Sequence, residues 1–440
     1  MRPLARALAI LACSLSASSA RAAVEDAGSA TPDFKPGDVI GFDTIEKLKP
    51  FVPKEFWDNR DFFFYEGMKL EIGPTNADYS PAKEYLAATL ENKGVAKIGP
   101  ENSLEGHRAG QPFLNDEIQC KSDPKAGAKI MWNHKYQWNG FGGEPANFYY
   151  SYWDRGEELP LYYQGVGQFI WLSRHVEKKF AKTDGDVFRG EKRTSAEGVQ
   201  VDEPFDARGI ALMTYRYKAS DGPKATSKND DTWVYVPTLR RVRRISTAQR
   251  TDAVAGTDFT LDDLFSFNGI VPQYEWKCLA EGRFLAPMNT KVRAYPYDKD
   301  HNFGPYGLSY ADDRWELRDS WVVEMDPRND DHPYSRKVIY IDKQTYTAHY
   351  SFAYDTKDEL WKILIHNKRW SEDTSLTGVW YKPWDGIESP RDLVIISDTI
   401  VNVQTGTGNR IEFWDRSGMP LASAGKIRRY IDVGRLTKGR

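Results

Sequence analysis

The sequence is poor in cysteine, in long apolar runs and in net charge, and each shortage excludes a class of protein. Three cysteines in 440 residues are too few for a zinc site built from four thiolates. No run of 18 apolar residues follows the N-terminal segment, so we expect no membrane-spanning helix. The chain has 60 Lys and Arg against 63 Asp and Glu, a net charge of −3, whereas nucleic-acid-binding surfaces are usually basic. We therefore expect no nucleic-acid partner.

Common catalytic and nucleotide-binding motifs are also missing. The sequence has no G-x-S-x-G, no P-loop, no Rossmann G-x-G-x-x-G after a strand and no H-E-x-x-H. The seven histidines are scattered, with no two at i, i+2 or i, i+4 spacing, so we predict no metal and no cofactor. No pair among the carboxylates is marked for acid–base catalysis, although a carbohydrate- or lipid-acting hydrolase with two carboxylates stays an alternative.

The N-terminus has the pattern of an export signal. Arg2 and Arg6 precede an apolar stretch, and residues 20–22 form an A-x-A cleavage site. We predict that residues 1–22 are a cleaved signal peptide and that the mature protein lies in the periplasm. An alternative is a degenerate lipobox that ends at Cys13, which would anchor the protein to the outer membrane as a lipoprotein.

After signal cleavage, Cys120 and Cys278 are the two cysteines that remain. Export places them in an oxidising compartment, where a disulfide between them is one expectation. The other expectation is that the two cysteines are unrelated buried thiols, because their separation of 158 residues says nothing about their proximity in space.

The distribution of Pro, Gly and apolar residues predicts two parts in the mature chain. Residues 23–147 contain short helical segments between loops, of which 80–94 is the clearest, with Ser80 as its N-cap and Gly94 as its stop. We predict that this part is a loop-rich N-terminal extension and that residues 148–440 form a sheet domain.

Alternation with a period of two dominates the later sequence. Residues 274–284 and 314–325 alternate apolar with charged side chains, so that Trp315 has one parity and Glu316 and Arg318 the other. The fold class is therefore mainly β, an antiparallel sheet for which we expect one buried face and one solvated face.

The apolar face is unusually aromatic, as expected in a chain with 14 Trp, 24 Tyr and 21 Phe. Such a face is either an ordinary filled core or the wall of a cavity for an amphipathic ligand, to which rigid rings with polar tips are suited. The candidate ligand-binding residues of this wall are Trp233, Tyr235, Trp276, Trp315, Trp321, Tyr350, Phe352 and Trp361.

A cluster of arginines follows the segment 232–237. If residues 239–245 form one straight strand, two arginines point to each face, and we expect that no register exposes all of them to solvent. The candidates for an internal ion pair or for an anionic-headgroup site are Arg240, Arg241, Arg243, Arg244 and Asp258.

Several segments, taken in order, resemble a known superfamily. "DTWVYVPTLRRVRR", "GTDFTLDDL" and "YIDKQTY" are similar to the LolA/LolB-like periplasmic lipoprotein carriers. "HRAGQPFLNDE" and "SDPKAGAKIMWNHKYQW" resemble one long branch of unknown function that is often labelled "outer membrane lipoprotein-sorting protein". The chain departs from that branch at Leu114, where a proline is usual, and at Gln111 before Pro112.

The resemblance implies a large antiparallel half-barrel wrapped around a few short helices and enclosing an apolar cavity. It also implies a non-enzymatic carrier or receptor for a lipid-like cargo, with an outer-membrane or resistance-nodulation-division transport system as partner and with peripheral contact to a membrane. The alternatives from the residues are the hydrolase named above and a structural assembly factor for an envelope complex.

Overall fold

The computed structural model describes residues 30–140, 143–154, 161–223, 228–245, 250–291, 304, 307–373, 391–414 and 424–438. The expected signal peptide and Cys13 lie outside these described residues. In the described part of the chain, no helix has the length and apolar character needed to cross a membrane.

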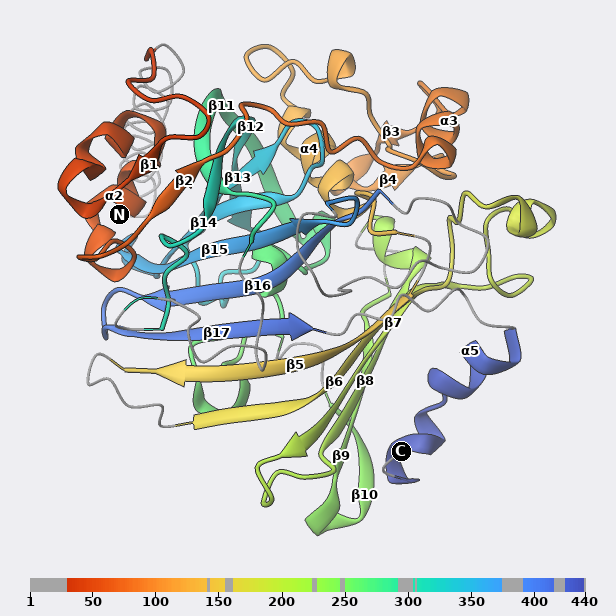
Figure 1. Ribbon diagram of the computed structural model, residues 1–440. Coiled ribbons are helices and arrows are strands. Elements are labelled where there is room, and N and C mark those ends of the chain that lie inside the picture. Colours follow the sequence, from red (N-terminus) through yellow and green to blue (C-terminus); the bar gives the residue numbers. More distant parts are fainter. Residues whose placement is uncertain are drawn as a thin grey trace, which may run out of the picture.

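A curved sheet of 15 strands organises the described chain (Figure 1). Apart from one parallel contact between β2 and β12, neighbouring strands run antiparallel, and β17 pairs with β5 to join the C-terminal strands to the middle of the chain. In spatial order the strands are β1 (Val39–Ile40), β2 (Leu70–Ile72), β12 (Arg314–Pro327), β13 (Arg336–Asp342), β14 (Ala348–Tyr354), β15 (Leu360–Trp370), β16 (Leu393–Asn402), β17 (Thr407–Trp414), β5 (Gly143–Trp153), β6 (Leu161–Trp171), β7 (Arg193–Glu203), β8 (Ala211–Tyr217), β9 (Asp231–Val236) and β10 (Arg241–Ile245), with β11 (Tyr274–Pro287) also paired to β12. This architecture confirms the expected fold class, a mainly β, antiparallel half-barrel with few helices.

Short helices lie against the sheet and in the segments that connect its strands (Figure 1). The α-helices are α2 (Lys54–Asp58), α3 (Lys83–Glu91), α4 (Ala126–Lys135) and α5 (Ala424–Tyr430). The 3-10 helices are η1 (Phe42–Phe51), η2 (Arg60–Phe62), η3 (Pro100–Asn102), η4 (Asn115–Glu117), η5 (Lys178–Thr183), η6 (Lys218–Asp221), η7 (Pro237–Leu239), η9 (Val254–Gly256), η10 (Leu264–Ser266), η11 (Val271–Gln273) and η12 (Val433–Lys438), and a small separate sheet pairs β3 (Lys97–Ile98) with β4 (Leu104–Glu105).

The N-terminal extension is built into the core of the sheet. Strand β2 pairs with the start of β12, and the rings of Phe56 and Phe63 stack at 4.4 Å between their centroids. Phe56 also packs against Trp315 and Tyr350 of the sheet, at 6.0 and 5.3 Å. We call this cluster of residues from 40–72 and from strands β11–β15 the N-terminal core.

Both faces of the central strands are buried, which corrects the expectation of one solvated face. On β13, Val338 and Tyr340 belong to the N-terminal core, whereas the alternate residues Ile339 and Ile341 pack with α4 in a second cluster, the α4 core. Three charged residues of β12, Glu316, Arg318 and Glu324, are therefore enclosed as well: Arg318 is 1 % exposed. Alternation identified the strands correctly but could not show that other segments of the chain cover the charged face.

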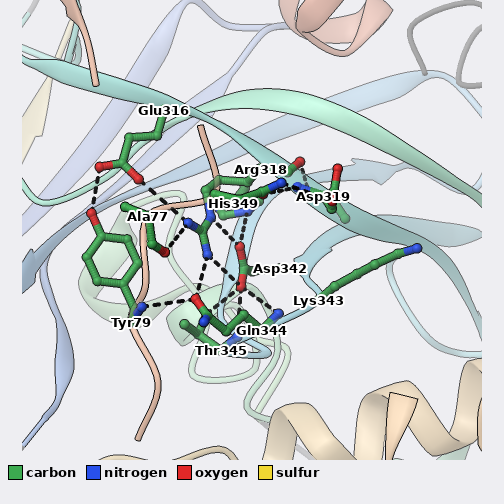
Figure 2. A network of polar contacts seen from close by, with 12 residues as sticks. Ala77, Tyr79, Glu316, Arg318, Asp319, Asp342, Lys343, Gln344, Thr345 and His349 are labelled. Carbon is green, nitrogen blue, oxygen red and sulfur yellow. Dashed lines mark hydrogen bonds and ion pairs between the residues drawn. The ribbon is translucent and has the colours of Figure 1, made fainter. Parts of the chain in front are cut away.

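The enclosed charges are paired within a polar network (Figure 2). The guanidinium of Arg318 donates to both oxygens of Asp342, at 2.7 and 3.3 Å, and to the carbonyl of Ala77 at 2.7 Å. On the same strand, Glu316 accepts a 2.6 Å hydrogen bond from the hydroxyl of Tyr79. These contacts compensate the desolvation of the buried ions and join the N-terminal extension to β12.

Cys120 and Cys278 form a disulfide, with their Cα atoms 5.2 Å apart. It joins the loop before α4 to β11, against which α4 packs. At this contact Gly127 leaves no room for a side chain, because a Cβ there would lie 2.7 Å from the backbone nitrogen of Lys277.

Strands β9 and β10 form a hairpin at the edge of the sheet, as "DTWVYVPTLRRVRR" predicts, but all four arginines are exposed. Arg240 lies in the turn with φ of 50° and is not part of a strand, and β10 has no further neighbour in the sheet. Arg244 pairs with Asp231. Asp258 lies elsewhere and accepts from Asn402 at 2.7 Å. The expectation that one arginine pair is enclosed is wrong, because all four side chains are exposed on this edge hairpin.

Candidate functional site

The eight aromatic residues proposed as one wall lie in three different clusters. Their local packing shows filled cores: Tyr350 donates its hydroxyl to the carbonyl of Leu285, and the indole of Trp276 donates to Val271 at 2.9 Å. The N-terminal core contains Trp315, Tyr350 and Phe352, the α4 core contains Trp276 and Trp321 with Trp361 beside it, and Trp233 and Tyr235 pack in a cluster with α5.

Strand irregularities separate some residues of equal parity, such as Trp276 in the α4 core and Phe284 in the N-terminal core. Pairing of β11 with β12 shifts register between Cys278 and Ala280, and pairing of β13 with β14 shifts between Tyr340 and Ile341. Each shift moves the following side chains to the opposite face of the sheet. On β12, Trp315 and Trp321 also have equal parity and lie in different cores, so the described residues do not form the single aromatic wall expected from the alternation.

A different set of rings encloses a cavity of about 120 Å³, which we call the aromatic cavity. Phe169 and Trp171 come from the end of β6, and Phe265 and Phe267 come from η10 and the residue after it. The rings of Phe169 and Phe265 lie 5.8 Å apart across the two elements. The end of α4, strands β7 and β8 and the start of β16 also contribute to the lining, including the charged residues Lys135, Glu197 and Arg216. This volume has room for roughly ten water-sized groups, and four rings make it suitable for an apolar moiety.

The conformation of η10 directs two of these rings into the cavity. Phe265 and Ser266 have φ of 56° and 70°, a left-handed conformation that costs about 1 kcal/mol or more per non-glycine residue. A buried relay holds this turn: the Ser266 hydroxyl contacts Nε2 of His366 at 2.5 Å, and Nδ1 of His366 contacts Asp398 at 2.5 Å. Burial lowers the pKa of His366 below its usual value, which favours the neutral ring.

Although the order of these groups resembles that of a serine-hydrolase triad, Ser266 is 0 % exposed and does not line the aromatic cavity. Its hydroxyl faces His366 and its carbonyl accepts a hydrogen bond from Lys337 at 2.5 Å. The relay therefore fastens η10 to the sheet.

A second anchor of η10 is an enclosed acid with basic partners. Asp263 is 1 % exposed and accepts from Lys337 at 2.8 Å and from the hydroxyl of Tyr334 at 2.6 Å. The ammonium of Lys362 lies 3.6 Å away. These two lysines hold the pKa of Asp263 far below its usual range in spite of burial, so the carboxylate stays ionised.

Next to the aromatic cavity lies a smaller space of about 60 Å³, the polar pocket. The two spaces share Gln137, Asn139 and Trp171 as lining residues. Five residues that line the polar pocket each have a buried polar atom without a hydrogen-bond partner among the described residues. These atoms are His107 Nε2, Gln137 Oε1, Ser173 Oγ, Arg174 Nη1 and Glu177 Oε1.

The charges beside the polar pocket are compensated. Asp221 accepts from Arg174 at 2.7 Å and from Lys135 at 2.9 Å, and the hydroxyl of Tyr136 donates to the same carboxylate. The two cations hold the pKa of Asp221 at about 2 against the effect of burial. The second oxygen of Glu177 is 3.2 Å from the ring of His175. The site therefore presents both donors and acceptors without a strong excess of either charge.

A third space, the α5 groove, has a volume of about 420 Å³. Its floor comes from β6, β7 and β8 and includes Val199 and Met213, and its rim carries Lys426 and Arg429 of α5. No group of three His, Cys, Asp or Glu residues that could hold a metal ion occurs in the described chain.

The chain belongs to the family described as "Protein of unknown function (DUF1329)". The family model matches residues 61–411, which confirms the resemblance to a long branch of unknown function. A curated relative is "Uncharacterized protein PA3922" of Pseudomonas aeruginosa, 26% identical over 319 residues. The match covers 71% of this chain. It covers 64% of the length of the relative, so this chain spans less than two thirds of that protein.

Solved structures of similar fold carry related names. One is a putative outer membrane lipoprotein-sorting protein domain from Vibrio parahaemolyticus, with 17% identity, a TM-score of 0.45 and coverage of 72% of this chain and 100% of that chain. Another is a DUF1329 family protein from Desulfovibrio piger, with 18% identity, a TM-score of 0.45 and the same coverage.

The residues of the two connected spaces were not among the candidates from the sequence. Phe169 and Trp171 stand in "GQFIW", a run with the β-strand alternation that was used elsewhere, and this signal could have found them. Phe265 and Phe267 stand in "TLDDLFSF", where no periodic signal shows that a turn aims both rings inward. The polar pocket is lined by residues between 85 and 177, and nothing in their spacing predicts that they lie together.

Proposed function

We propose that this protein is a non-enzymatic periplasmic carrier or receptor that binds a hydrophobic, lipid-like ligand in the aromatic cavity. The observation that carries the proposal is a cavity lined by Phe169, Trp171, Phe265 and Phe267, whereas most of the aromatic candidates from the sequence are buried in the N-terminal core and the α4 core. Burial of about 200 Å² of apolar ligand surface there would contribute about 5 kcal/mol before association costs.

Export and partnership are part of the same proposal. The signal-like N-terminus and the disulfide between Cys120 and Cys278 support an oxidising compartment, the periplasm. The resemblance to LolA/LolB-like carriers supports release of the cargo at the outer membrane or to a resistance-nodulation-division transport system. Ligand uptake in this site requires no bond to be made or broken.

Matched cavity-filling variants test the site. Val394 lines the aromatic cavity and Val199 lines the α5 groove, so Val394→Phe and Val199→Phe make the same change in two spaces. We expect Val394→Phe to weaken binding of the neutral fluorescent probe 1-N-phenylnaphthylamine at least tenfold, and Val199→Phe to change it less than twofold. Near-ultraviolet circular dichroism checks that both variants are folded. The reverse pattern would move the proposed site to the α5 groove.

Native mass spectrometry of the protein from its own periplasm tests the carrier role itself. We expect a bound lipid-like mass that is released by denaturation. Purification with a membrane complex and without any extractable ligand would instead support an assembly factor, and turnover of an ester or glycoside would support a hydrolase.

A further inference from the structure

The unpaired polar atoms of the polar pocket require partners that the described chain does not supply. A buried polar atom without a hydrogen bond destabilises a protein, so such atoms are few and usually meet water or a ligand. Ser173 is 5 % exposed, and its hydroxyl is unpaired and lines the pocket. Three more residues that line the same 60 Å³ carry an unpaired atom, namely His107, Gln137 and Arg174. Glu177 Oε1 also lacks a hydrogen bond, and it lies 3.9 Å from the ammonium of Lys179. The gathering of these residues around one small space distinguishes this site from isolated unpaired atoms elsewhere.

The chemistry of these five atoms is mixed. Nη1 of Arg174 only donates, whereas Oε1 of Gln137 and Oε1 of Glu177 accept. The Ser173 hydroxyl does both. Burial and the neighbouring Arg174 hold the pKa of His107 well below its usual range, so its ring is neutral and Nε2 either donates or accepts. A partner that satisfies all five atoms must itself offer donors and acceptors close together.

The surrounding charges exclude a strongly ionic partner. An anion such as a phosphate would gain from Arg174, but this guanidinium is already paired with Asp221, and the anion would meet the carboxylate of Glu177. A cation would meet Arg174 itself. The hydroxyl groups of an uncharged polyol both donate and accept hydrogen bonds, as the pocket requires. The rings of Tyr136 and Trp171 line the same pocket and can pack against the carbon skeleton of such a ligand.

We propose that the polar pocket binds an uncharged, polyhydroxylated headgroup, a sugar or another polyol, of an amphiphile whose apolar part lies in the aromatic cavity. The inference rests on the proposed function and names the class of its ligand. The two spaces share Gln137, Asn139 and Trp171, so they are adjacent, and a molecule that occupies both would pass these residues. The pocket has room for about four or five water-sized groups, which is enough for part of a sugar ring.

Three amphiphiles with the same chain test the headgroup. Octyl β-D-glucoside, octyl phosphate and octyltrimethylammonium are compared, below their micelle concentrations, as competitors of 1-N-phenylnaphthylamine. We expect the glucoside to bind at least tenfold more tightly than the other two. Equal affinities would show that the chain alone is bound and that water fills the polar pocket, and a preference for phosphate or ammonium would also overturn the inference. Absence of probe binding would overturn the proposed function as well.

Variants of the unpaired atoms supply an independent readout. Ser173→Ala and Gln137→Leu remove unpaired atoms, so we expect each to weaken glucoside binding at least fivefold without lowering the melting temperature of the ligand-free protein. The control is Ser103→Ala, because Ser103 is 0 % exposed and its hydroxyl is unpaired but does not line the polar pocket. It should leave glucoside affinity unchanged. Unchanged affinity in both pocket variants would contradict the headgroup assignment.

Discussion

Single buried residues carry much of the chemistry of this fold. Glu316 is 1 % exposed, and one of its oxygens accepts from Tyr79. The other oxygen has no hydrogen bond, and it lies 3.6 Å from a guanidinium nitrogen of Arg318. Burial outweighs both neighbours and raises the pKa of Glu316 to about 7. In the network of Figure 2, Asp342 is therefore ionised, whereas Glu316 is about half protonated at pH 7.

The titration of Glu316 predicts a pH dependence of stability. Because its folded-state pKa lies above the unfolded value of 4.5, the folded state keeps a proton that the unfolded state releases. The resulting stabilisation is complete below pH 4.5 and is lost as pH rises to about 7. We expect the free energy of unfolding of the wild type, relative to Glu316→Gln, to fall by up to about 1.4 kcal/mol per pH unit between pH 5 and 7. Urea unfolding at pH 5, 6, 7 and 8 measures this difference, and a parallel pH dependence of both proteins would contradict the assignment.

At the scale of elements, the attachment of α4 to β11 decides the shape of the candidate site. The C-terminal end of α4 supplies His134 to the aromatic cavity, and the residues just after it supply Gln137 to both spaces. Gly127 allows the close approach of helix and strand, and the disulfide ties the loop before the helix to the same strand. The hydrogen bond from the ring of His134 to the carbonyl of Tyr346, at 2.8 Å, fixes the other end.

Loss of the disulfide should therefore weaken both the fold and the site. The bond closes a loop of 158 residues, and removal of such a cross-link raises the entropy of the unfolded chain. We expect the double variant Cys120→Ser, Cys278→Ser to lose about 2–5 kcal/mol of stability in urea unfolding. Dithiothreitol should destabilise the wild type and leave the double variant unaffected. An equal response of both proteins to the reductant would show that the bond contributes nothing.

At the scale of the whole molecule, the N-terminal extension and the sheet share one core. Residues 39–72 supply two strands to the sheet edge and the rings that cover Trp315 and Tyr350. The hydroxyl of Tyr354 also reaches Glu55 of α2, at 2.8 Å. A chain without this segment would expose a large aromatic surface to water.

Hydrogen exchange tests this integration. We expect the buried backbone amides of Leu70 and Ile72 to exchange about as slowly as those of β13 and β14, because their release requires opening of the shared core. If the amides of residues 40–72 exchanged orders of magnitude faster than those of β13 and β14, the extension would only rest on the surface of the sheet.

The sequence by itself determined the family, the β-strand alternation and the two cysteines available for one disulfide, because these depend on local patterns and on order along the chain. The hairpin of β13 and β14 and that of β9 and β10 follow directly from such patterns. Tertiary structure alone decided which face each side chain occupies. Register shifts exchange the faces of aromatic residues with equal parity, and the chain covers both sides of β13. The rings of the aromatic cavity and the residues of the polar pocket come together through contacts between segments that are distant in sequence. No local sequence pattern predicts such contacts.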